Sequence, residues 1–122
     1  MRAPVIGNKS VLITGCSSGI GLATAELLRS SGWKVFPTAR KLDDLDSLRQ
    51  AGFEAVKLDV TSNKSIATAV EWVLVKNEGM LGAVVNNAGF GMPGAIQDLS
   101  RDAMRQQFEV NVFGLQELTN TL

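Results

Sequence analysis

Residues 11–21 read VLITGCSSGIG and combine a short apolar run, a glycine-rich turn and the beginning of a helical pattern. The run Val11-Leu12-Ile13 is apolar and is followed by Thr14-Gly15, which predicts a buried strand. The helical pattern begins at Ile20 and is expected to end at Gly32. A strand that passes through glycines directly into a helix is typical of the first half of a βαβ unit. Residues 11–21 therefore predict an α/β fold.

The rest of the chain repeats this alternation of apolar runs and helical patterns. Further strands are expected at residues 34–38, 53–58 and 83–85, and further helices at residues 43–50, after a cap at Thr61 or Ser62, and after a cap at Ser100. Pro37 weakens the second strand or marks its end. The order βαβαβαβα predicts a single domain, residues 1–122, with a parallel sheet and helices on both of its faces.

Composition excludes several classes of function. The 122 residues include 12 Lys+Arg and 12 Asp+Glu, so the zero net charge leaves no basic footprint for nucleic acid. No apolar run approaches the roughly 20 residues of a membrane-spanning helix, and residues 1–9 lack the apolar core of a signal peptide. One cysteine and no histidine allow neither a disulfide framework nor a Cys/His metal site. We therefore expect a cytoplasmic protein with no metal, no nucleic-acid partner and no membrane partner.

The glycine loop has the composition of a phosphate-binding turn. Gly15, Gly19 and Gly21 allow a tight turn and a close approach of backbone to an anion, and the following helix offers free N–H groups at its positive end. Ser17 and Ser18 add two hydroxyl donors. The spacing G-x-x-x-G-x-G differs from G-x-G-x-x-G, and no lysine follows Gly19 as a P-loop requires. A turn that merely uses glycine is the alternative.

Four motifs, in order along the chain, resemble those of the short-chain dehydrogenase/reductase family. They are Thr14-Gly15-x-x-x-Gly19-x-Gly21, Asp59-Val60, Asn86-Asn87-Ala88-Gly89, and Asn111 within Asn111-Val112-Phe113-Gly114. The resemblance covers the chain from about Lys9 to Leu122. It implies a Rossmann-like, doubly wound parallel sheet, here truncated to about four strands in the order 3-2-1-4 with flanking helices. The chain would then be the N-terminal, cofactor-binding half of such an enzyme.

The same resemblance implies roles for single residues. The loop glycines and Ile20 would border the cofactor pyrophosphate, Asp59 would accept a hydrogen bond from the adenine amino group beside the Val60 backbone, and the loop after the fourth strand would lie near the ribose. With the two loop serines and Arg40, the expected cofactor-binding residues are Thr14, Gly15, Ser17, Ser18, Gly19, Ile20, Gly21, Arg40, Asp59, Val60, Asn86, Ala88 and Gly89. Asp59 could instead cap a turn or helix, and Asn86 and Asn87 could serve hydrogen bonding within their loop.

The end of the second strand bears on the choice of cofactor. A carboxylate there would bind the 2′-hydroxyl of NAD and repel the 2′-phosphate of NADP. This strand ends Thr38-Ala39-Arg40 without an acid, and the planar guanidinium of Arg40 suits a phosphate. We therefore expect NADP(H) to be preferred over NAD(H). Arg40 could alternatively be solvated, or paired with Asp43 or Asp44.

The family's active site consists of a serine followed by a Tyr-x-x-x-Lys motif, and this sequence contains no tyrosine. Asn111 resembles the family's helix asparagine, an accessory catalytic group that helps hold a water near the active lysine; it could instead bond across helices. The complete enzyme would transfer hydride between NADP(H) and a carbonyl or alcohol, and this chain alone is expected to be inactive. A non-catalytic nucleotide-binding or interaction module is the alternative function. Cys16, inside the glycine loop, is interpreted as a small filler without chemistry.

The last helix carries apolar residues on two faces. Periodicity places Val110 and Phe113 on the outer face, and the following residues on the face expected to pack on the core: Met104, Phe108, Asn111, Val112, Leu115, Leu118 and Leu122. A second apolar face predicts a second contact, with a partner chain or with protein that this chain lacks, although two exposed apolar residues are also tolerated. The resemblance implies that this helix packs in a dimer interface. We therefore expect a homodimer or larger assembly through residues 101–122.

Overall fold

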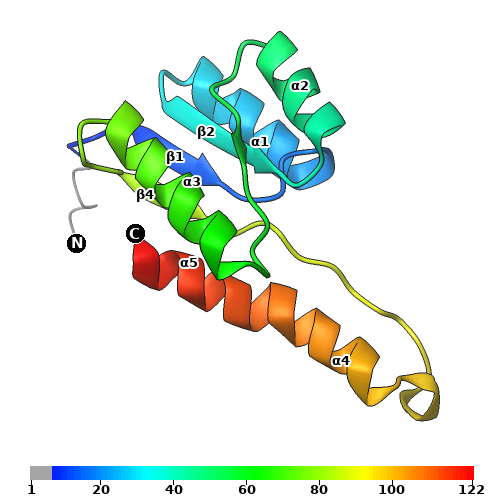
Figure 1. Ribbon diagram of the computed structural model, residues 1–122. Helices are drawn as coiled ribbons and strands as arrows, with labels where there is room; N and C mark the ends of the chain where they lie inside the picture. The colour runs from blue at the N-terminus through cyan, green and yellow to red at the C-terminus, as the bar shows by residue number, and fades with distance from the viewer. Residues whose placement is uncertain (1–6) are drawn as a thin grey trace, which may run out of the picture.

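A parallel sheet of four strands forms the centre of the protein, whose computed structural model describes residues 7–122 (Figure 1). The strands are β1 (Ser10–Ile13), β2 (Lys34–Ala39), β3 (Val56–Lys57) and β4 (Ala83–Val85). They lie in the order β3-β2-β1-β4 and all pair in parallel, which confirms the expected Rossmann-like sheet. Residues 1–6, part of the segment considered above for a signal peptide, lie outside the described residues.

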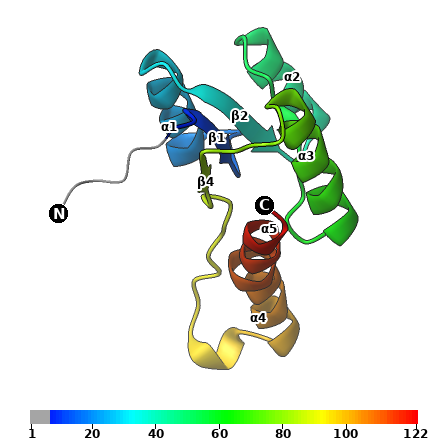
Figure 2. The ribbon, with the colours of Figure 1, turned by 90° about the vertical axis from the view of Figure 1, so that its left-hand side faces the viewer.

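Helices cover both faces of the sheet. They are α1 (Gly19–Ser30), α2 (Leu42–Gln50), α3 (Asn63–Lys76), α4 (Arg101–Phe108) and α5 (Leu115–Thr121). A π-helical turn, Glu109–Gly114, joins α4 to α5, and a short 3-10 turn, Ile96–Asp98, precedes α4. Figures 1 and 2 show α1 and α2 on one side of the sheet and α3 and α5 on the other. Within residues 7–122, no helix is both long enough and apolar enough to cross a membrane.

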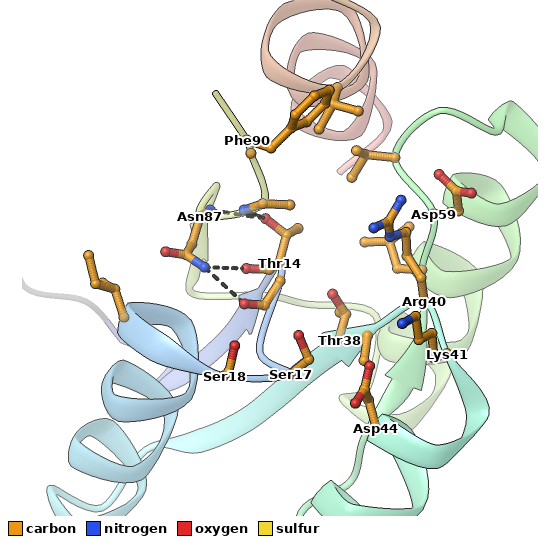
Figure 3. A pocket seen from close by; sticks show the side chains of 18 residues that line it. Thr14, Ser17, Ser18, Thr38, Arg40, Lys41, Asp44, Asp59, Asn87 and Phe90 are labelled. Atoms are coloured by element: carbon orange, nitrogen blue, oxygen red, sulfur yellow. Dashed lines mark hydrogen bonds between the residues drawn. The ribbon is translucent and has the colours of Figure 1, made fainter. Parts of the chain in front are cut away.

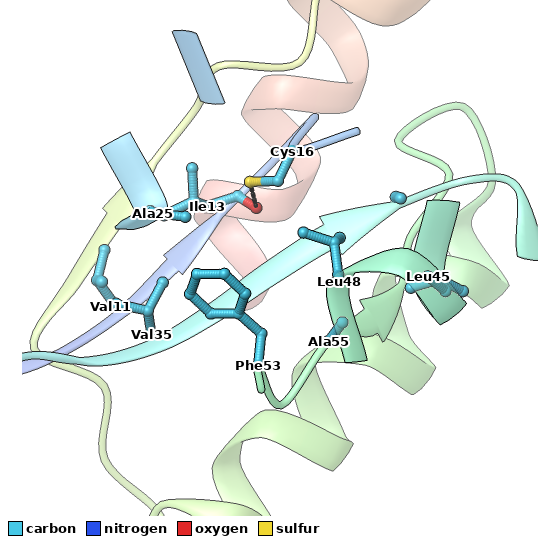
Figure 4. Close-up of a cluster of buried hydrophobic side chains, with 10 residues drawn as sticks. Val11, Ile13, Cys16, Ala25, Val35, Leu45, Leu48, Phe53 and Ala55 are labelled. Atoms are coloured by element: carbon cyan, nitrogen blue, oxygen red, sulfur yellow. Dashed lines mark hydrogen bonds between the residues drawn. The ribbon is translucent and has the colours of Figure 1, made fainter. Parts of the chain in front are cut away.

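Alternate side chains of the strands supply a hydrophobic cluster on each face of the sheet. In β1, Val11 and Ile13 join the cluster with residues of α1 and α2 (Figure 4), while Leu12 joins the cluster with residues of α3 and α5. The second cluster also contains Phe36, whose ring lies edge-on to Trp72 with the centroids 6.1 Å apart. Because both faces of the central strand are covered, residues 11–13 of β1 are consecutive apolar residues instead of an alternating pattern.

Three strands have bounds that differ from the sequence prediction, and β1 differs only in beginning one residue earlier, at Ser10. β2 continues through Pro37 to Ala39, because the carbonyl of Thr38 still accepts from the N–H of Cys16 at 2.7 Å and pairing continues past the proline. β3 is limited to Val56–Lys57 and does not begin at Phe53. Phe53 buries its side chain in the cluster that faces α1 and α2, so its apolar character reflects packing against helices and not strand pairing.

The segment from α4 to α5 packs on the core through a face that the sequence analysis assigned wrongly. Leu118 is buried as expected, but Val110 packs against the same cluster although it was placed on the outer face. Gly114 lies between them and is buried against Val60, where a Cβ on Gly114 would collide with the Val60 carbonyl oxygen. The expected core-facing residues are instead 37–50% exposed: Met104, Phe108, Val112, Leu115 and Leu122. The helical segment thus packs on the core at Gly114, its smallest residue. The close approach of its backbone to Val60, and not the periodicity of its apolar residues, determines which face is buried.

We predict that Gly114→Ala destabilises the protein by about 1–3 kcal/mol, despite the better helix propensity of alanine, because the added methyl group forces α5 away from Val60. Urea denaturation followed by circular dichroism measures the free energy of unfolding. Gly91→Ala is the matched control, since no atom lies within 4 Å of a Cβ built on Gly91. Equal free energies of unfolding for the two variants would contradict the close-approach explanation.

Candidate functional site

A cleft of about 620 Å³ opens at the carboxyl ends of the strands (Figure 3). Its walls come from the loop between β1 and α1, the end of β2 with the start of α2, the segment after β3, and the loop after β4. Most of the predicted cofactor-binding residues line it: Thr14, Gly15, Ser17, Ser18, Ile20, Arg40, Asp59, Val60, Ala88 and Gly89. Open α/β sheets bind their ligands in crevices of this kind, outside the carboxyl ends of the strands.

Three predicted residues lie outside the lining of the cleft: Gly19, Gly21 and Asn86. A Cβ on Gly21 would collide with the Gly15 carbonyl oxygen and would lie 2.5 Å from Nδ2 of Asn87, so glycine lets the first turn of α1 pack against the loop. Asn86 reaches α5, where its Nδ2 donates to Oγ1 of Thr119 at 3.1 Å. Both residues therefore support the elements around the cleft without bordering it.

Thr14 and Asn87 tie the glycine loop to the loop after β4. The Thr14 hydroxyl oxygen accepts from the N–H groups of Asn87 at 3.0 Å and Ala88 at 2.8 Å. Nδ2 of Asn87 donates to the carbonyl oxygens of Thr14 and Gly15, both at 3.0 Å. We call this set of four bonds the Thr14–Asn87 clamp. The alternative considered for Asn87 was hydrogen bonding within its own loop. The structure shows that Asn87 instead bonds to the neighbouring glycine loop.

The amino end of α1 borders the cleft without a capping side chain. Ser18 occupies the N-cap position and makes no side-chain cap bond, whereas Ser62 and Ser100 cap α3 and α4. The first-turn N–H groups of α1 therefore lack a side-chain acceptor and carry the positive end of the helix dipole. The side chains of Ser17 and Ser18 lie beside them in Figure 3. This donor set fits a phosphate or pyrophosphate group.

Cationic side chains line the cleft at the end of β2. Arg40 and Lys41 are both exposed and both border it. Among the ion pairs of residues 7–122, none joins Arg40 to Asp43 or Asp44, so the pairing considered above is not observed. Asp44 nevertheless lines the same end of the cleft, because the first turn of α2 follows Lys41 directly.

Several lining residues were not predicted to bind: Thr38, Ala39, Lys41, Asp44, Leu58, Asn87, Phe90 and Val110. Lys41 and Asn87 are adjacent in sequence to predicted residues, and that adjacency was the available signal. Val110 gave no such signal, because its place depends on the close packing of the helical segment on Val60. Predicted motifs thus locate the cleft, and tertiary contacts complete it.

Asp59 borders the cleft after β3 and is held by a neighbouring threonine. Its Oδ1 accepts from the backbone N–H of Thr61 at 2.9 Å and from the Thr61 hydroxyl at 2.7 Å. These two bonds hold the pKa of Asp59 below its ordinary value of 3.8, with a further contribution from the charge of Arg40. The carboxyl group is therefore ionised at neutral pH. The turn-capping alternative is observed, and the adenine contact stays a prediction.

Asn111, in the π-helical turn, holds the loop after β4 through both polar atoms of its amide. Its Oδ1 accepts from the N–H of Phe90 at 3.0 Å, and its Nδ2 donates to the Phe90 carbonyl at 2.8 Å. One turn earlier, Oε1 of Gln107 accepts from the N–H of Met92 at 3.2 Å. The bonds of Asn111 run to a loop and not across helices, and its accessory part in catalysis stays a prediction.

Cys16 lies next to the cleft but does not line it. Its side chain is fully buried, and its Sγ donates to the Ile13 carbonyl at 3.3 Å (Figure 4). Burial raises the pKa of the Cys16 thiol to about 11, so the thiol is protonated at neutral pH and is a poor nucleophile. Cys16 therefore packs as a small apolar side chain, in agreement with its interpretation from the sequence as a filler without chemistry. In the described part of the chain, no group of three or more His, Cys, Asp or Glu residues is placed to hold a metal ion.

We predict that Asn87→Ala lowers the free energy of unfolding by about 1–3 kcal/mol, because the Thr14–Asn87 clamp loses both side-chain donations to half-buried carbonyl groups. Asn86→Ala is the control, since it removes the same side chain at the neighbouring position and one exposed hydrogen bond. Thermal or urea unfolding measures both variants. Equal stability of the two would show that the clamp does not hold the loops together.

Comparisons with known proteins agree on one family. The family model adh_short, described as short chain dehydrogenase, matches residues 9–122. The oxidoreductase YbbO of Escherichia coli K12 is 45% identical over 114 residues, which cover 93% of this chain and 42% of YbbO. The crystal structure of a short-chain dehydrogenase from Streptomyces avermitilis has a TM-score of 0.86 at 39% identity, covering 95% of this chain and 44% of that one.

A variant of actinorhodin polyketide ketoreductase, crystallised with NADPH, has a TM-score of 0.82 at 33% identity and covers 98% of this chain and 48% of that one. The chain therefore spans less than half of the length of each of these three proteins. The family match extends over nearly all of the sequence, and the sheet has the order that the family motifs implied. Taken together, the motifs, the sheet and the matches establish that this chain belongs to the short-chain dehydrogenase family.

Proposed function

We propose that this chain is the NADP(H)-binding part of a short-chain dehydrogenase/reductase whose complete form transfers hydride between NADP(H) and a carbonyl or alcohol substrate. The observation that carries the proposal is that one cleft has two kinds of anion-binding group. Hydrogen-bond donors suited to a phosphate lie at one wall, and Arg40 and Lys41 lie at another. NADP(H) carries anionic groups at two separate points, the pyrophosphate and the 2′-phosphate. The NADPH in the similar ketoreductase structure supports the choice of cofactor. When bound, the nicotinamide ring supplies or accepts the hydride.

The pyrophosphate is assigned to the amino end of α1. The uncapped N–H groups of its first turn and the hydroxyls of Ser17 and Ser18 are donors suited to that anion. The Thr14–Asn87 clamp joins this loop to the loop after β4 within the chain itself. A loop that is already ordered loses less conformational entropy when it binds a ligand.

The adenosine end of the cofactor is assigned to the segment after β2 and the segment after β3. Arg40 can donate two parallel N–H groups to a 2′-phosphate, and Lys41 adds a second positive charge. Asp59 and the backbone of Val60, which border the cleft on the same side as Arg40 (Figure 3), are assigned to the adenine ring. Because Arg40 gains a charged partner only from a 2′-phosphate, this arrangement favours NADP(H) over NAD(H).

Hydride transfer also needs an acid/base group, and the tyrosine that the family uses is absent from this sequence. Asn111 is assigned a positioning role, because its amide holds the backbone of Phe90, which borders the cleft. We therefore expect the 122-residue chain to bind the cofactor without turning over substrate. A cytoplasmic location belongs to the same proposal.

We further propose that residues 101–122 form the contact between two copies of the chain. Six large apolar side chains are exposed on α4, on α5 and on the π-helical turn between them, and we call them together the apolar face of α4 and α5: Met104, Phe108, Val112, Phe113, Leu115 and Leu122. Phe108 and Phe113 are 50% and 52% exposed, and their ring centroids lie 6.4 Å apart. Adjacent exposed apolar side chains of this kind are typical of protein contact surfaces. α4 contributes no buried residue to the described core, so its surface is accessible to a second copy.

We predict that calorimetric titration of the chain gives tighter binding for NADPH than for NADH. Arg40→Ala is expected to weaken NADPH binding by about tenfold or more, the size of a lost charge-assisted hydrogen bond, and to leave NADH binding nearly unchanged. Arg101→Ala is the control, because it removes the same charge from the start of α4, outside the cleft. Absence of binding by either cofactor, or an equal loss of both in Arg40→Ala, would refute the cofactor assignment.

Sedimentation equilibrium tests the contact between copies. We expect the wild-type chain to be a dimer or larger and Phe108→Glu to shift it toward the monomer, because the new charge would have to be buried in the contact. Ile96→Glu is the control: Ile96 is 87% exposed but lies outside the apolar face of α4 and α5. A wild-type chain that stays monomeric at high concentration would refute the proposed contact.

A further inference from the structure

The cleft contains a carboxylate that the proposed function does not use. Asp44 lies in the first turn of α2, lines the cleft, and is only partly exposed. In Figure 3 its carboxylate lies on the same side as Lys41 and the hydroxyl of Thr38, at the end of β2. Its neighbour Asp43 is exposed on the same helical turn and does not line the cleft. One of two adjacent acids is therefore directed toward the ligand side.

Asp44 forms no ion pair with any described residue. The ion pairs within residues 7–122 join Lys34 to Glu54, Arg49 to Asp46 and Arg105 to Asp102, and none includes Asp44. Asp44 lies in the first turn of α2, at the positive end of the helix dipole, and the N-cap residue Lys41 makes no side-chain cap bond. The helix dipole stabilises the negative charge without consuming its hydrogen-bonding capacity. Asp44 thus retains acceptor oxygens for a ligand.

The chemistry at this end of the cleft is therefore mixed. Arg40 and Lys41 favour a phosphate, whereas a carboxylate at the same end repels a phosphate and accepts a hydrogen bond from a hydroxyl. The two kinds of group correspond to the two forms of the adenosine ribose, with and without the 2′-phosphate. The strand end itself offers no acid, because it reads Thr38-Ala39-Arg40.

On the basis of the proposed NADP(H) site, we infer that Asp44 is a specificity-determining residue that limits the preference for NADP(H) and allows NAD(H) to bind. It accepts a hydrogen bond from the 2′-hydroxyl when no phosphate is present, and it opposes the 2′-phosphate by like charge. Arg40 favours NADP(H) and Asp44 favours NAD(H), so the two residues have opposite effects on cofactor preference. The selectivity of the cleft is then the difference between their two contributions.

The test compares two probes that differ by one phosphate: adenosine 2′,5′-bisphosphate and adenosine 5′-monophosphate. Titration calorimetry of the full 122-residue chain gives both dissociation constants for the wild type, Asp44→Asn and Asp44→Ala. Asp44→Asn is expected to tighten bisphosphate binding by about fivefold, the order of effect of removing one like charge across a solvated cleft. Asp44→Ala is expected to weaken monophosphate binding by about threefold, through one lost hydrogen bond.

Asp43→Asn and Asp43→Ala are the matched controls, because they remove the same group from the neighbouring position of the same helical turn. Selective effects at Asp44 with none at Asp43 are the expected result. Equal effects at the two positions, or no change in the Asp44 variants, would overturn the inference and leave the proposed function standing. A wild-type chain that binds neither probe would refute the proposed function itself, and this inference with it.

Discussion

The buried hydroxyl of Thr14 is the group on which the geometry of the cleft depends. It lies directly after β1 and accepts from two consecutive N–H groups of the loop after β4. Because β1 is flanked by β2 and β4, a bond at its carboxyl end joins the two loops that border the ligand side. Gly15 follows with φ +71°, and a Cβ there would lie 2.9 Å from the Cα of Ala88. The hydroxyl of Thr14 and the lack of a Cβ at Gly15 therefore determine how closely the two loops approach each other.

A second close approach, between Gly114 and Val60, positions the helical segment from α4 to α5 against the segment after β3. It brings Val110 against the core and keeps the π-helical turn beside the loop after β4, where Asn111 holds Phe90. The segment after β3, the helical segment and the loop after β4 are thereby linked into one boundary of the cleft. The apolar side chains that this packing leaves outside belong to the face of α4 and α5 that we assign to a second copy.

The sheet order and most of the cleft lining were predicted through the resemblance to the family, whose motifs can be recognised from local patterns. Glycine spacing, apolar runs of three to six residues and the amide-rich loop are all visible within short windows. The inward face of the last helix was predicted wrongly, since hydrophobic periodicity records where apolar residues lie and not how closely backbones approach. The part that Asn87 plays could not be predicted locally, because its side chain bonds to Thr14 and Gly15, which are distant in sequence. Lys41 directly follows the predicted Arg40 and was missed although that adjacency was visible.

Cofactor selectivity in such a cleft is a local property. The chain has no net charge, so no overall field steers a phosphate toward it. Arg40, Lys41, Asp44 and Asp59 together bring two positive and two negative side chains to the same cleft. Because charges of both signs border one cleft, their separate positions matter more than their sum. A preference for NADP(H) therefore depends on which of these side chains faces the ribose, and small changes in the first turn of α2 can alter it.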